Sequence, residues 1–228
     1  MERIYDCSVD TDLLTGMRLA KAALGRKELA VIPTDTVYGL ACDAFSHEGV
    51  KKLLEAKGRD RTAPPPVLIG NSSALEGLAQ DIPQLAHKLA ETFWPGALTM
   101  ILKAQPSLTW DLGETKGTVA LRMPDHKIAL ALLQETGPLA VSSANFTGEP
   151  AATTCQQAEI ALGAKVKVYL DAGASPKGEA STIVDMTGLV ETVSESGEIV
   201  TTGKARIVRR GALSQQKLAT VLGEYLEG

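Results

Sequence analysis

The apolar residues of this chain alternate between two spacings, and this alternation restricts the fold more than any other feature. Helical spacing over 13–24, after a cap at Asp10 or Thr11, is followed by the short apolar run 29–32, which has the length of a buried strand. The same alternation continues to the end of the chain. It predicts helices at 50–56, 85–93, 127–134, 156–162 and 215–225, and strands at 67–69, 98–102, 118–123, 139–142, 166–170, 182–185 and 207–208.

Alternating strands and helices predict an α/β protein with a layered sheet. The stretch 98–123 contains two strands without a helix between them, so we expect a mixed sheet and not an all-parallel one. No break in the pattern resembles a linker, which predicts a single domain over 1–228. Within it, Ser, Gly and Thr residues over 191–204 predict a hairpin or a mobile loop, and a C-terminal helix capped by Ser214 is predicted over 214–226.

Composition excludes several classes of function. Hydrophobic residues make up 44% of the 228 residues and charged residues 22%, which is typical of a globular protein that folds alone. A net charge of −4 gives no general attraction to nucleic acid, and 4% aromatic residues argue against stacking platforms for single strands. The three cysteines lack metal-ligand spacing, and no signal segment or membrane span is evident. We therefore predict reduced thiols, no membrane association and a cytoplasmic location.

Three cations follow the helix predicted at 50–56. Lys57, Arg59 and Arg61 are two residues apart, so an extended chain would project them to the same side, where they could bind a polyanion. The alternative is that Lys57 and Arg59 merely complement the negative end of the helix. Lys57 lies four residues after Leu53, on the apolar face, where an unpaired charge is costly, so we expect it to have an anionic partner.

Other polar groups lie in or just after predicted strands. Thr118 and Arg122 share one face of a strand, and the arginine requires either a structural carboxylate or a bound anion. Ser143 and Asn145 follow an apolar strand, at a position where open α/β sheets bind ligands, although a simple turn is the other interpretation. The stretch PTDTVYGLACDAF, from Pro33, similarly presents several hydroxyl groups directly after a buried strand.

Several chemistries are excluded by missing motifs. The chain has no GxxxxGK[ST] loop, no GxGxxG and no GxSxG elbow, and its three histidines lack metal-ligand spacing. We therefore predict no metal site built by the protein. The remaining cations and hydroxyls indicate a site for a phosphorylated or carboxylated small molecule.

Seven stretches together resemble one family. In chain order they are PTDTVYGLACDAF, AKGRDRTAPPPVL, FWPGALTMIL, VALRMPDH, VSSANFTGEP, ASTIVD and IVRRGAL. This ordered set, which includes a KxR element from Lys57 and an SxN element from Ser143, is similar to the YrdC/Sua5 family of threonylcarbamoyl-AMP synthases. The similarity extends from about Ala30 to Leu213.

The resemblance implies a YrdC-like twisted, mixed open sheet flanked by helices around a basic cavity. It also implies a nucleotidyltransferase that uses L-threonine, bicarbonate or CO2, and ATP with Mg2+ to form threonylcarbamoyl-AMP and pyrophosphate. In the family this product serves the N6-threonylcarbamoyladenosine modification of tRNA position 37, through transient contact with a transferase complex of the TsaD type. The chain is similar to the short form of the family, without the additional C-terminal domain.

Residue roles carry over from the matched motifs. The threonine-binding residues implied by the resemblance are Thr34, Arg122, Val141 and Ser181. The ATP-binding residues implied are Lys57, Arg59, Arg61, Thr118, Ser143, Asn145 and Arg209, and of these the catalytic ones are Lys57, Arg59, Ser143 and Asn145. Three positions depart from the family pattern, namely Asp60, Pro65 and Arg210, and Tyr38 is equally compatible with a packing role.

Two other functions remain open at this point. One is a YrdC-like module that binds tRNA or double-stranded RNA without synthase activity, which the acidic net charge disfavours. The other is a divergent homologue that acts on another carbamate, which the intact KxR and SxN elements disfavour.

Overall fold

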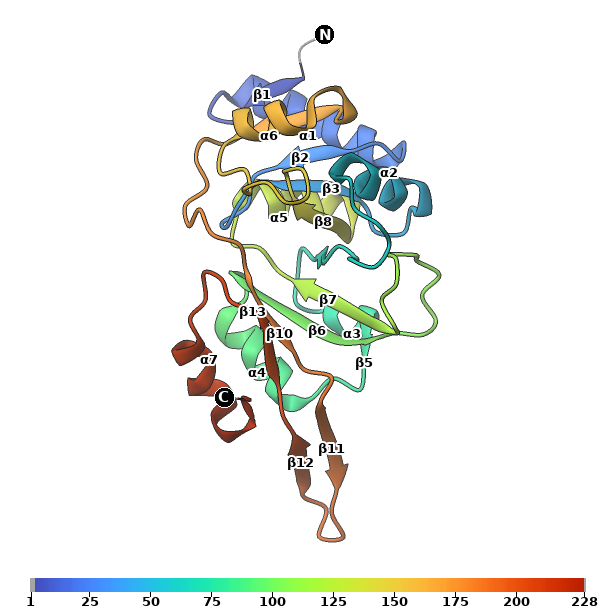
Figure 1. Cartoon of the computed structure of the whole chain (residues 1–228), viewed down its shortest axis with the longest axis vertical. Helices are drawn as coiled ribbons and strands as arrows, with labels where there is room; N and C mark the ends of the chain where they lie inside the picture. The colour runs from blue at the N-terminus through green and yellow to red at the C-terminus, as the bar shows by residue number, and fades with distance from the viewer. Residues whose placement is uncertain (1–2, 228) are drawn as a thin grey trace.

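The computed structural model describes residues 3–227 and contains one large sheet, a separate hairpin and helices around both (Figure 1). The strands of the large sheet are β1 (Ile4–Asp6), β2 (Ala30–Ile32), β3 (Gly39–Asp43), β4 (Val67–Leu68), β5 (Ala79–Gln80), β6 (Leu98–Ala104), β7 (Thr118–Arg122), β8 (Leu139–Ser143), β9 (Val168–Asp171), β10 (Thr182–Asp185) and β13 (Arg206–Arg209). The helices are α1 (Asp10–Gly25), α2 (His47–Lys57), α3 (Ala74–Leu78), α4 (Gln84–Phe93), α5 (Lys127–Thr136), α6 (Cys155–Leu162) and α7 (Gln215–Leu222).

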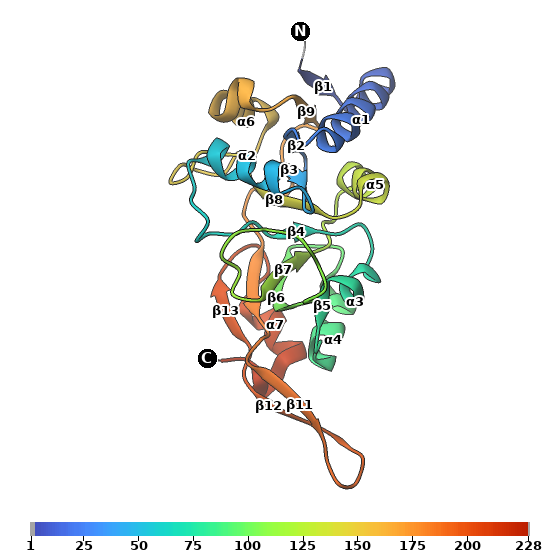
Figure 2. The same ribbon diagram turned by 90° about the vertical axis from the view of Figure 1, so that its right-hand side faces the viewer.

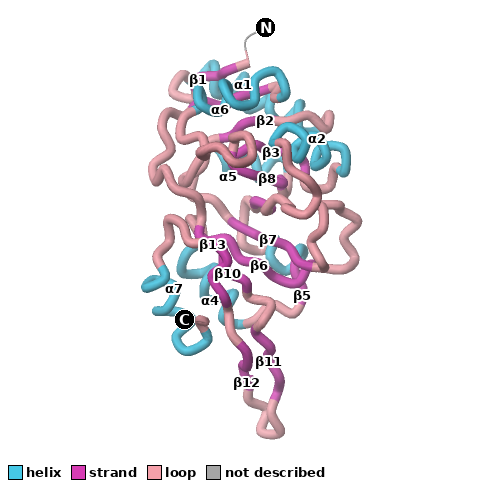
Figure 3. Tube along the Cα trace, viewed as in Figure 1, coloured by secondary structure: helices cyan, strands magenta, loops and turns pink. Residues whose placement is uncertain are grey.

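The large sheet is mixed, as predicted. Its strand order is β1-β9-β2-β3-β8-β4-β7-β6-β10-β13, with β5 paired to β6. The pairs β1–β9, β2–β9, β4–β7 and β6–β10 are parallel, and the pairs β2–β3, β3–β8, β4–β8, β6–β7 and β10–β13 are antiparallel. Figure 3 shows these strands following one another from the upper to the lower end of the molecule.

Helices cover both faces of the upper strands. In Figure 2, α1 and α5 lie on one side of β2, β3 and β8, while α2 and α6 lie on the other. Strand alternation explains this arrangement, because Ala30 and Ile32 belong to the hydrophobic cluster under α1, whereas Val31 belongs to the larger cluster under α2. Both faces are therefore buried, and the strands are continuous apolar runs, as the sequence predicted.

Local signals account for the helix ends, with one correction. Ser46 caps α2 by accepting a hydrogen bond from the Gly49 amide at 3.0 Å, and Gly58 ends the helix with φ +61°, in the left-handed region that favours glycine. The predicted cap of α1 at Asp10 or Thr11 is wrong. Val9 occupies the cap position without a side-chain bond, and Asp10 lies within the first turn, where its charge complements the helix dipole.

Sequence periodicity missed four short elements. β1, α3 and β5 have two to five residues and are too short to display a period. β3 begins at Gly39 and ends at Asp43, two residue types that are depleted in strands, so its register against β2 and β8 was not predicted. The chain therefore turns back directly after β2 to form another buried strand.

The predicted hairpin is present. β11 (Leu189–Val193) and β12 (Ile199–Gly203) form an antiparallel two-stranded sheet that projects from the lower end of the molecule (Figures 1 and 2). At the end of the chain, α7 begins after Ser214, whose hydroxyl accepts a bond from the Lys217 amide. None of the helices formed by residues 3–227 has both the length and the apolar composition that a membrane span requires.

Candidate active site

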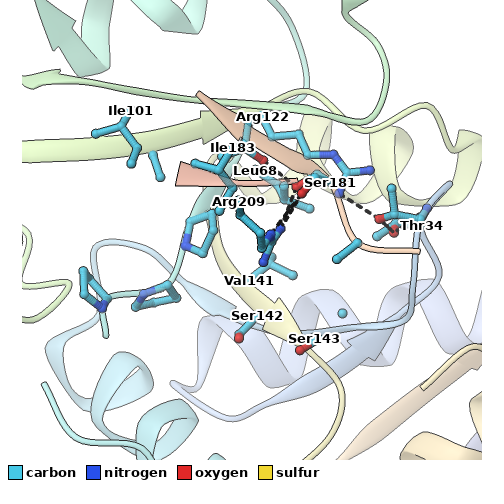
Figure 4. A pocket seen from close by; sticks show the side chains of 18 of the residues that line it. Thr34, Leu68, Ile101, Arg122, Val141, Ser142, Ser143, Ser181, Ile183 and Arg209 are labelled. Carbon is cyan, nitrogen blue, oxygen red and sulfur yellow. Dashed lines mark hydrogen bonds between the residues drawn. The ribbon is translucent and has the colours of Figure 1, made fainter. Parts of the chain in front are cut away.

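A cavity of about 280 Å³ lies where segments from most of the sheet meet (Figure 4). Its walls come from the turn after β2, the loop after α2, the strands β4, β6, β7 and β8, and the beginning and end of the β10–β13 pair. The predicted site residues that line it are Thr34, Arg59, Thr118, Arg122, Val141, Ser143, Ser181 and Arg209. The fold thus brings together side chains that are up to 175 positions apart, from 34 to 209.

The hydroxyl groups after β2 are held in a tight turn. The Thr34 hydroxyl donates to the Val37 carbonyl at 2.6 Å, accepts from the Thr36 amide at 3.2 Å and lies 3.0 Å from the Thr36 hydroxyl. Both threonines are buried, at 3% and 1% exposure. This Ser/Thr-type turn fixes the direction of the chain where it leaves the sheet and places Thr34 and Thr36 in the cavity wall.

Arg122, at the end of β7, is held on three sides. Its Nε donates to the Gly96 carbonyl at 2.9 Å, its Nη1 to the Thr36 hydroxyl at 2.8 Å, and its Nη2 to the Asp35 carboxylate. A structural carboxylate was one of the two partners expected for this arginine, and that alternative is confirmed. Since guanidinium carries five N–H donors, these three bonds leave two donors on a side chain that lines the cavity.

Asp35 is the buried carboxylate of this region. Besides Arg122, it accepts from Lys177 Nζ at 2.9 Å and from the Asp125 amide at 3.0 Å. Burial alone would raise the pKa of Asp35, but the charges of Arg122 and Lys177 outweigh burial and hold it below its ordinary value. Asp35 is therefore an anion that compensates the cations beside it.

A second arginine is fixed from β13. Arg209 donates through Nε and Nη2 to the Ser181 carbonyl, at 3.0 and 2.8 Å, and through Nη2 to the Ser181 hydroxyl at 3.0 Å, as Figure 4 shows. That hydroxyl lies 2.7 Å from the hydroxyl of Thr99 on β6. Burial, with the nearby charges of Arg122 and Arg59, lowers the pKa of Arg209. The arginines are thus close enough to influence one another.

The three cations after α2 do not converge, so that prediction is wrong. Arg59 lines the cavity and donates to the Ser142 hydroxyl at 3.3 Å. Arg61 is on the surface, where it pairs with Asp111 at 2.6 Å. Gly58 is the physical reason, because its left-handed conformation turns the chain between Lys57 and Arg59 and breaks the alternation of an extended segment.

Lys57 is fully buried beneath the cavity wall. Its Nζ donates to the carbonyl oxygens of Ser143 and Asn145, the latter at 2.7 Å, and lies 3.4 Å from Asn145 Oδ1. The expected anionic partner is therefore wrong, since carbonyl dipoles solvate this amine. Burial and the charge of Arg59 lower its pKa to about 8.

Asn145 completes the same turn. Its Nδ2 donates to the carbonyls of Phe146 and Glu149, at 2.9 and 2.7 Å. Lys57 and Asn145 are outside the lining of the 280 Å³ cavity and shape the turn that presents Ser143 to it. The alternative of local turn bonds is confirmed for Asn145.

Sequence reasoning missed four polar residues of the site: Asp35, Thr36, Thr99 and Ser142. Thr36, Thr99 and Ser142 line the cavity, and Asp35 holds Arg122. A signal existed for Asp35, since it is the only acid between the threonines of PTDT and Arg122 required a carboxylate. The strand order that brings these two together was not predictable.

The charges of the cavity lining have one sign. Arg59, Arg122 and Arg209 are its charged members, and no carboxylate occurs among the described lining residues. Asp35 lies behind Arg122 and is shared with Lys177. Elsewhere among residues 3–227, no group of three or more His, Cys, Asp or Glu side chains is arranged to hold a metal ion.

Comparison with known proteins identifies the family. The model of the Sua5/YciO/YrdC family, which carries the description "Telomere recombination", matches residues 22–197. The chain belongs to this family.

Relatives of the Sua5/YciO/YrdC family cover nearly all of the chain. A protein from Mycobacterium leprae named "Putative threonylcarbamoyl-AMP synthase" is 46% identical over 223 residues, which are 98% of this chain and 95% of that protein. A solved double variant of Sua5 from Pyrococcus abyssi superposes with a TM-score of 0.87 at 31% identity, over 99% of this chain.

Another Sua5 structure from P. abyssi is a complex with L-threonine, with a TM-score of 0.83 and 30% identity over 99% of this chain. This chain spans 62% of the length of the P. abyssi Sua5 chains. The superpositions confirm the mixed open sheet that the family resemblance implied.

Proposed function

We propose that this protein is an L-threonylcarbamoyladenylate synthase, which converts L-threonine, bicarbonate or CO2, and ATP into threonylcarbamoyl-AMP and pyrophosphate. The observation that carries the proposal is the convergence of Arg59, Arg122 and Arg209 on one cavity that is also lined by hydroxyl groups. Such a site suits one ligand with a triphosphate and another with a carboxylate. The names of the relatives and the threonine complex of P. abyssi Sua5 support the same reaction.

We propose that threonine binds at the end of the cavity formed by Thr34, Arg122, Val141 and Ser181. Arg122 has two N–H donors left for the substrate carboxylate, and its remaining donors are fixed by protein acceptors. A preorganised guanidinium loses little freedom when it binds a carboxylate. Val141 and the buried Thr99–Ser181 pair would limit the space around the substrate side chain.

The ATP phosphates are proposed to bind at the other end, beside Arg59 and Arg209. Thr118 and Ser143, which also line the cavity, would add hydroxyl donors without adding charge. Lys57 and Asn145 would act on ATP through the turn that carries Ser143, and Arg61 is too far out on the surface for a role in the described cavity. Mg2+ is proposed to enter as part of the substrate, bound by phosphate oxygens, as it commonly is in nucleotide sites.

The proposed chemistry needs no covalent enzyme intermediate. The amine of threonine, after losing a proton, adds to the carbon of CO2 and forms a carbamate. A carbamate oxygen then attacks the α-phosphorus of ATP while the bond from that phosphorus to the bridging oxygen breaks, so that pyrophosphate leaves with the electron pair. The fixed arginines would hold the reactants in line and stabilise the negative charge that develops on the phosphates.

The product is an activated carbamate, so a second protein must transfer it to the acceptor nucleoside in tRNA. We propose transient contact with a transferase complex of the TsaD type, in the cytoplasm. The alternative of an RNA-binding module is not favoured, because three arginines line an internal cavity while the chain carries a net charge of −4.

Pyrophosphate release tests the proposal. The purified protein should release pyrophosphate only when threonine, bicarbonate and MgATP are all present, and mass spectrometry should detect threonylcarbamoyl-AMP. Arg59→Ala should lower turnover by about 100- to 1000-fold, the effect of removing one preorganised donor to a developing charge. Arg26→Ala, which changes an arginine that is 63% exposed and outside the cavity lining, is the matched control. Pyrophosphate release that is independent of threonine would refute the proposal.

A further inference from the structure

Residues 172–181, named here the crossing segment, form one wall of the cavity. They connect β9 to β10, which are consecutive strands in the sequence but are separated in the sheet by β2, β3, β8, β4, β7 and β6. Figure 1 shows this part of the chain running from the upper to the lower half of the molecule. Its last two residues, Ala180 and Ser181, line the cavity. The position of the crossing segment therefore decides the shape of the site.

The crossing segment has almost no apolar anchorage. None of residues 172–180 is buried, so packing against the core does not fix this stretch. Its two ends are held by hydrogen bonds. At the start, the Tyr38 hydroxyl donates to the Gly173 carbonyl at 2.6 Å and accepts from the Ala172 amide at 3.0 Å. At the end, Arg209 donates to the carbonyl and hydroxyl of Ser181.

The middle of the segment is attached mainly through Lys177. Its amide donates to the Asp35 carbonyl at 3.2 Å, and its Nζ donates to the Asp35 carboxylate at 2.9 Å. One further backbone bond joins the Ser175 amide to the Thr153 carbonyl at 2.8 Å. The Lys177 side chain is 37% exposed, whereas the carboxylate it reaches is 3% exposed. A flexible surface lysine thus reaches a buried anion that would otherwise have Arg122 as its only charged partner among the printed contacts of the described residues.

Asp35 joins two parts of the cavity through one carboxylate. Its Oδ1 accepts from Arg122 and from the Asp125 amide, and its Oδ2 accepts from Lys177. Arg122 in turn donates to Thr36, which contacts Thr34. The network therefore runs from the crossing segment to the side chains proposed to bind threonine, and it does not include Arg59 or Thr118 on the proposed ATP side.

We infer that Asp35 and Lys177 form a latch that positions the crossing segment and Arg122 for threonine binding. Asp35 and Lys177 are positioning residues, because they act through Arg122 and Ser181 and are not in the cavity lining. With the latch closed, Ser181 and Arg122 face the substrate from fixed positions. Without the Lys177 side chain, the segment loses its one ionic attachment and the threonine end of the cavity loosens. The kinetic part of this inference rests on the proposed function.

The test compares Lys177→Met with Lys177→Arg and with Lys21→Met as the matched control. Lys21 is also an exposed lysine in an ion pair, at 3.1 Å from Glu135, but it lies on α1 outside the cavity lining. For each variant, pyrophosphate release gives kcat and the KM values for threonine and ATP, and hydrogen exchange monitors peptides that contain 172–181. Methionine keeps the length of the lysine stem, and the partly exposed site makes loss of folding an unexpected result, which the melting temperature checks.

Lys177→Met should raise the KM for threonine about tenfold, with less than a twofold change for ATP, because binding of one substrate is selectively weakened. Exchange should accelerate within 172–181 and not elsewhere, and Lys177→Arg should restore most of both properties. Wild-type values of the threonine KM in Lys177→Met would overturn the positioning role, whatever the exchange result. Unchanged exchange would overturn the latch. If the wild-type protein shows no threonine-dependent release, the proposed function fails, and the exchange comparison still decides the latch separately.

Discussion

Replacing Lys57 by methionine separates the stability of the buried amine from its role in shaping the site. In the structure this amine is completely buried and donates to the carbonyls of Ser143 and Asn145. Methionine has a similar length and no charge. The substitution removes the donors and leaves two carbonyl oxygens without this partner, which costs about 1 to 3 kcal/mol for each buried group.

The substitution also removes the cost of holding a charge in the interior. Burial and the charge of Arg59 lower the pKa of Lys57 from 10.5 to about 8, a difference of about 2.5 units. At about 1.36 kcal/mol per unit, the charged form is disfavoured by about 3.4 kcal/mol in the folded state. The two effects oppose each other near neutral pH, so the free energy of unfolding should change by less than about 2 kcal/mol there.

The pH dependence has a definite sign. Between pH 8 and 10.5 the unfolded chain binds a proton at Lys57 that the folded chain has already released, so the stability of the wild-type protein rises with pH in this window. From pH 7 to pH 10 the wild-type protein should gain about 2 to 3 kcal/mol relative to Lys57→Met. Groups that titrate equally in both proteins cancel in this comparison.

Urea unfolding at pH 7 and pH 10 measures the gain. Lys51→Met, on the same helix but 76% exposed, should show no comparable change with pH. Turnover of Lys57→Met at pH 7 should fall at least tenfold although the protein remains folded, because Ser143 loses its fixed position. A wild-type gain below about 0.5 kcal/mol between the two pH values would refute the reasoning about the buried charge.

Three further substitutions test other parts of the site. Gly58→Ala should lower the free energy of unfolding by about 1 to 3 kcal/mol in urea, because φ is +61° and a Cβ would lie 2.3 Å from Phe146 Cζ; wild-type stability would contradict the role of this turn. Arg122→Lys keeps the charge but loses the planar fork, so the KM for threonine should rise at least tenfold, and an unchanged KM would exclude this residue from substrate binding. Asp35→Asn removes a carboxylate whose pKa is below its ordinary 3.8, so the stabilisation present above that pH should be lost as the pH falls further in the wild-type protein only; parallel acid unfolding curves would contradict it.

Much of the fold follows from local patterns in the sequence. The helices and the longer strands display their periods, and the strands near the middle of the sheet are apolar because both of their faces are covered. β3 was not predicted because it carries glycine and aspartate at its ends, and its partners β2 and β8 come from distant parts of the chain. Register and strand order depend on such long-range pairings, which one sequence does not reveal.

The site could be predicted as a set of residues more readily than as a geometry. Arg59, Arg122 and Arg209 line one cavity, as the matched motifs implied for their segments. The alternation rule failed at Lys57 and Arg61, because one left-handed glycine redirects the chain. The partner of Arg122 could be predicted by type but not by position, since Asp35 and Arg122 meet only through the folded sheet.

The strand order also bears on how the molecule is made. β1 and β2 lie at the beginning of the chain but both pair with β9, and the cavity wall is completed only by residues from β10 and β13. A growing chain therefore cannot close its sheet until about three quarters of it has been synthesised, and pairings of such long sequence separation are slow to form. Truncated products that end before β13 would lack Arg209, so a retained nucleotide would serve as a marker for chains that have been completed.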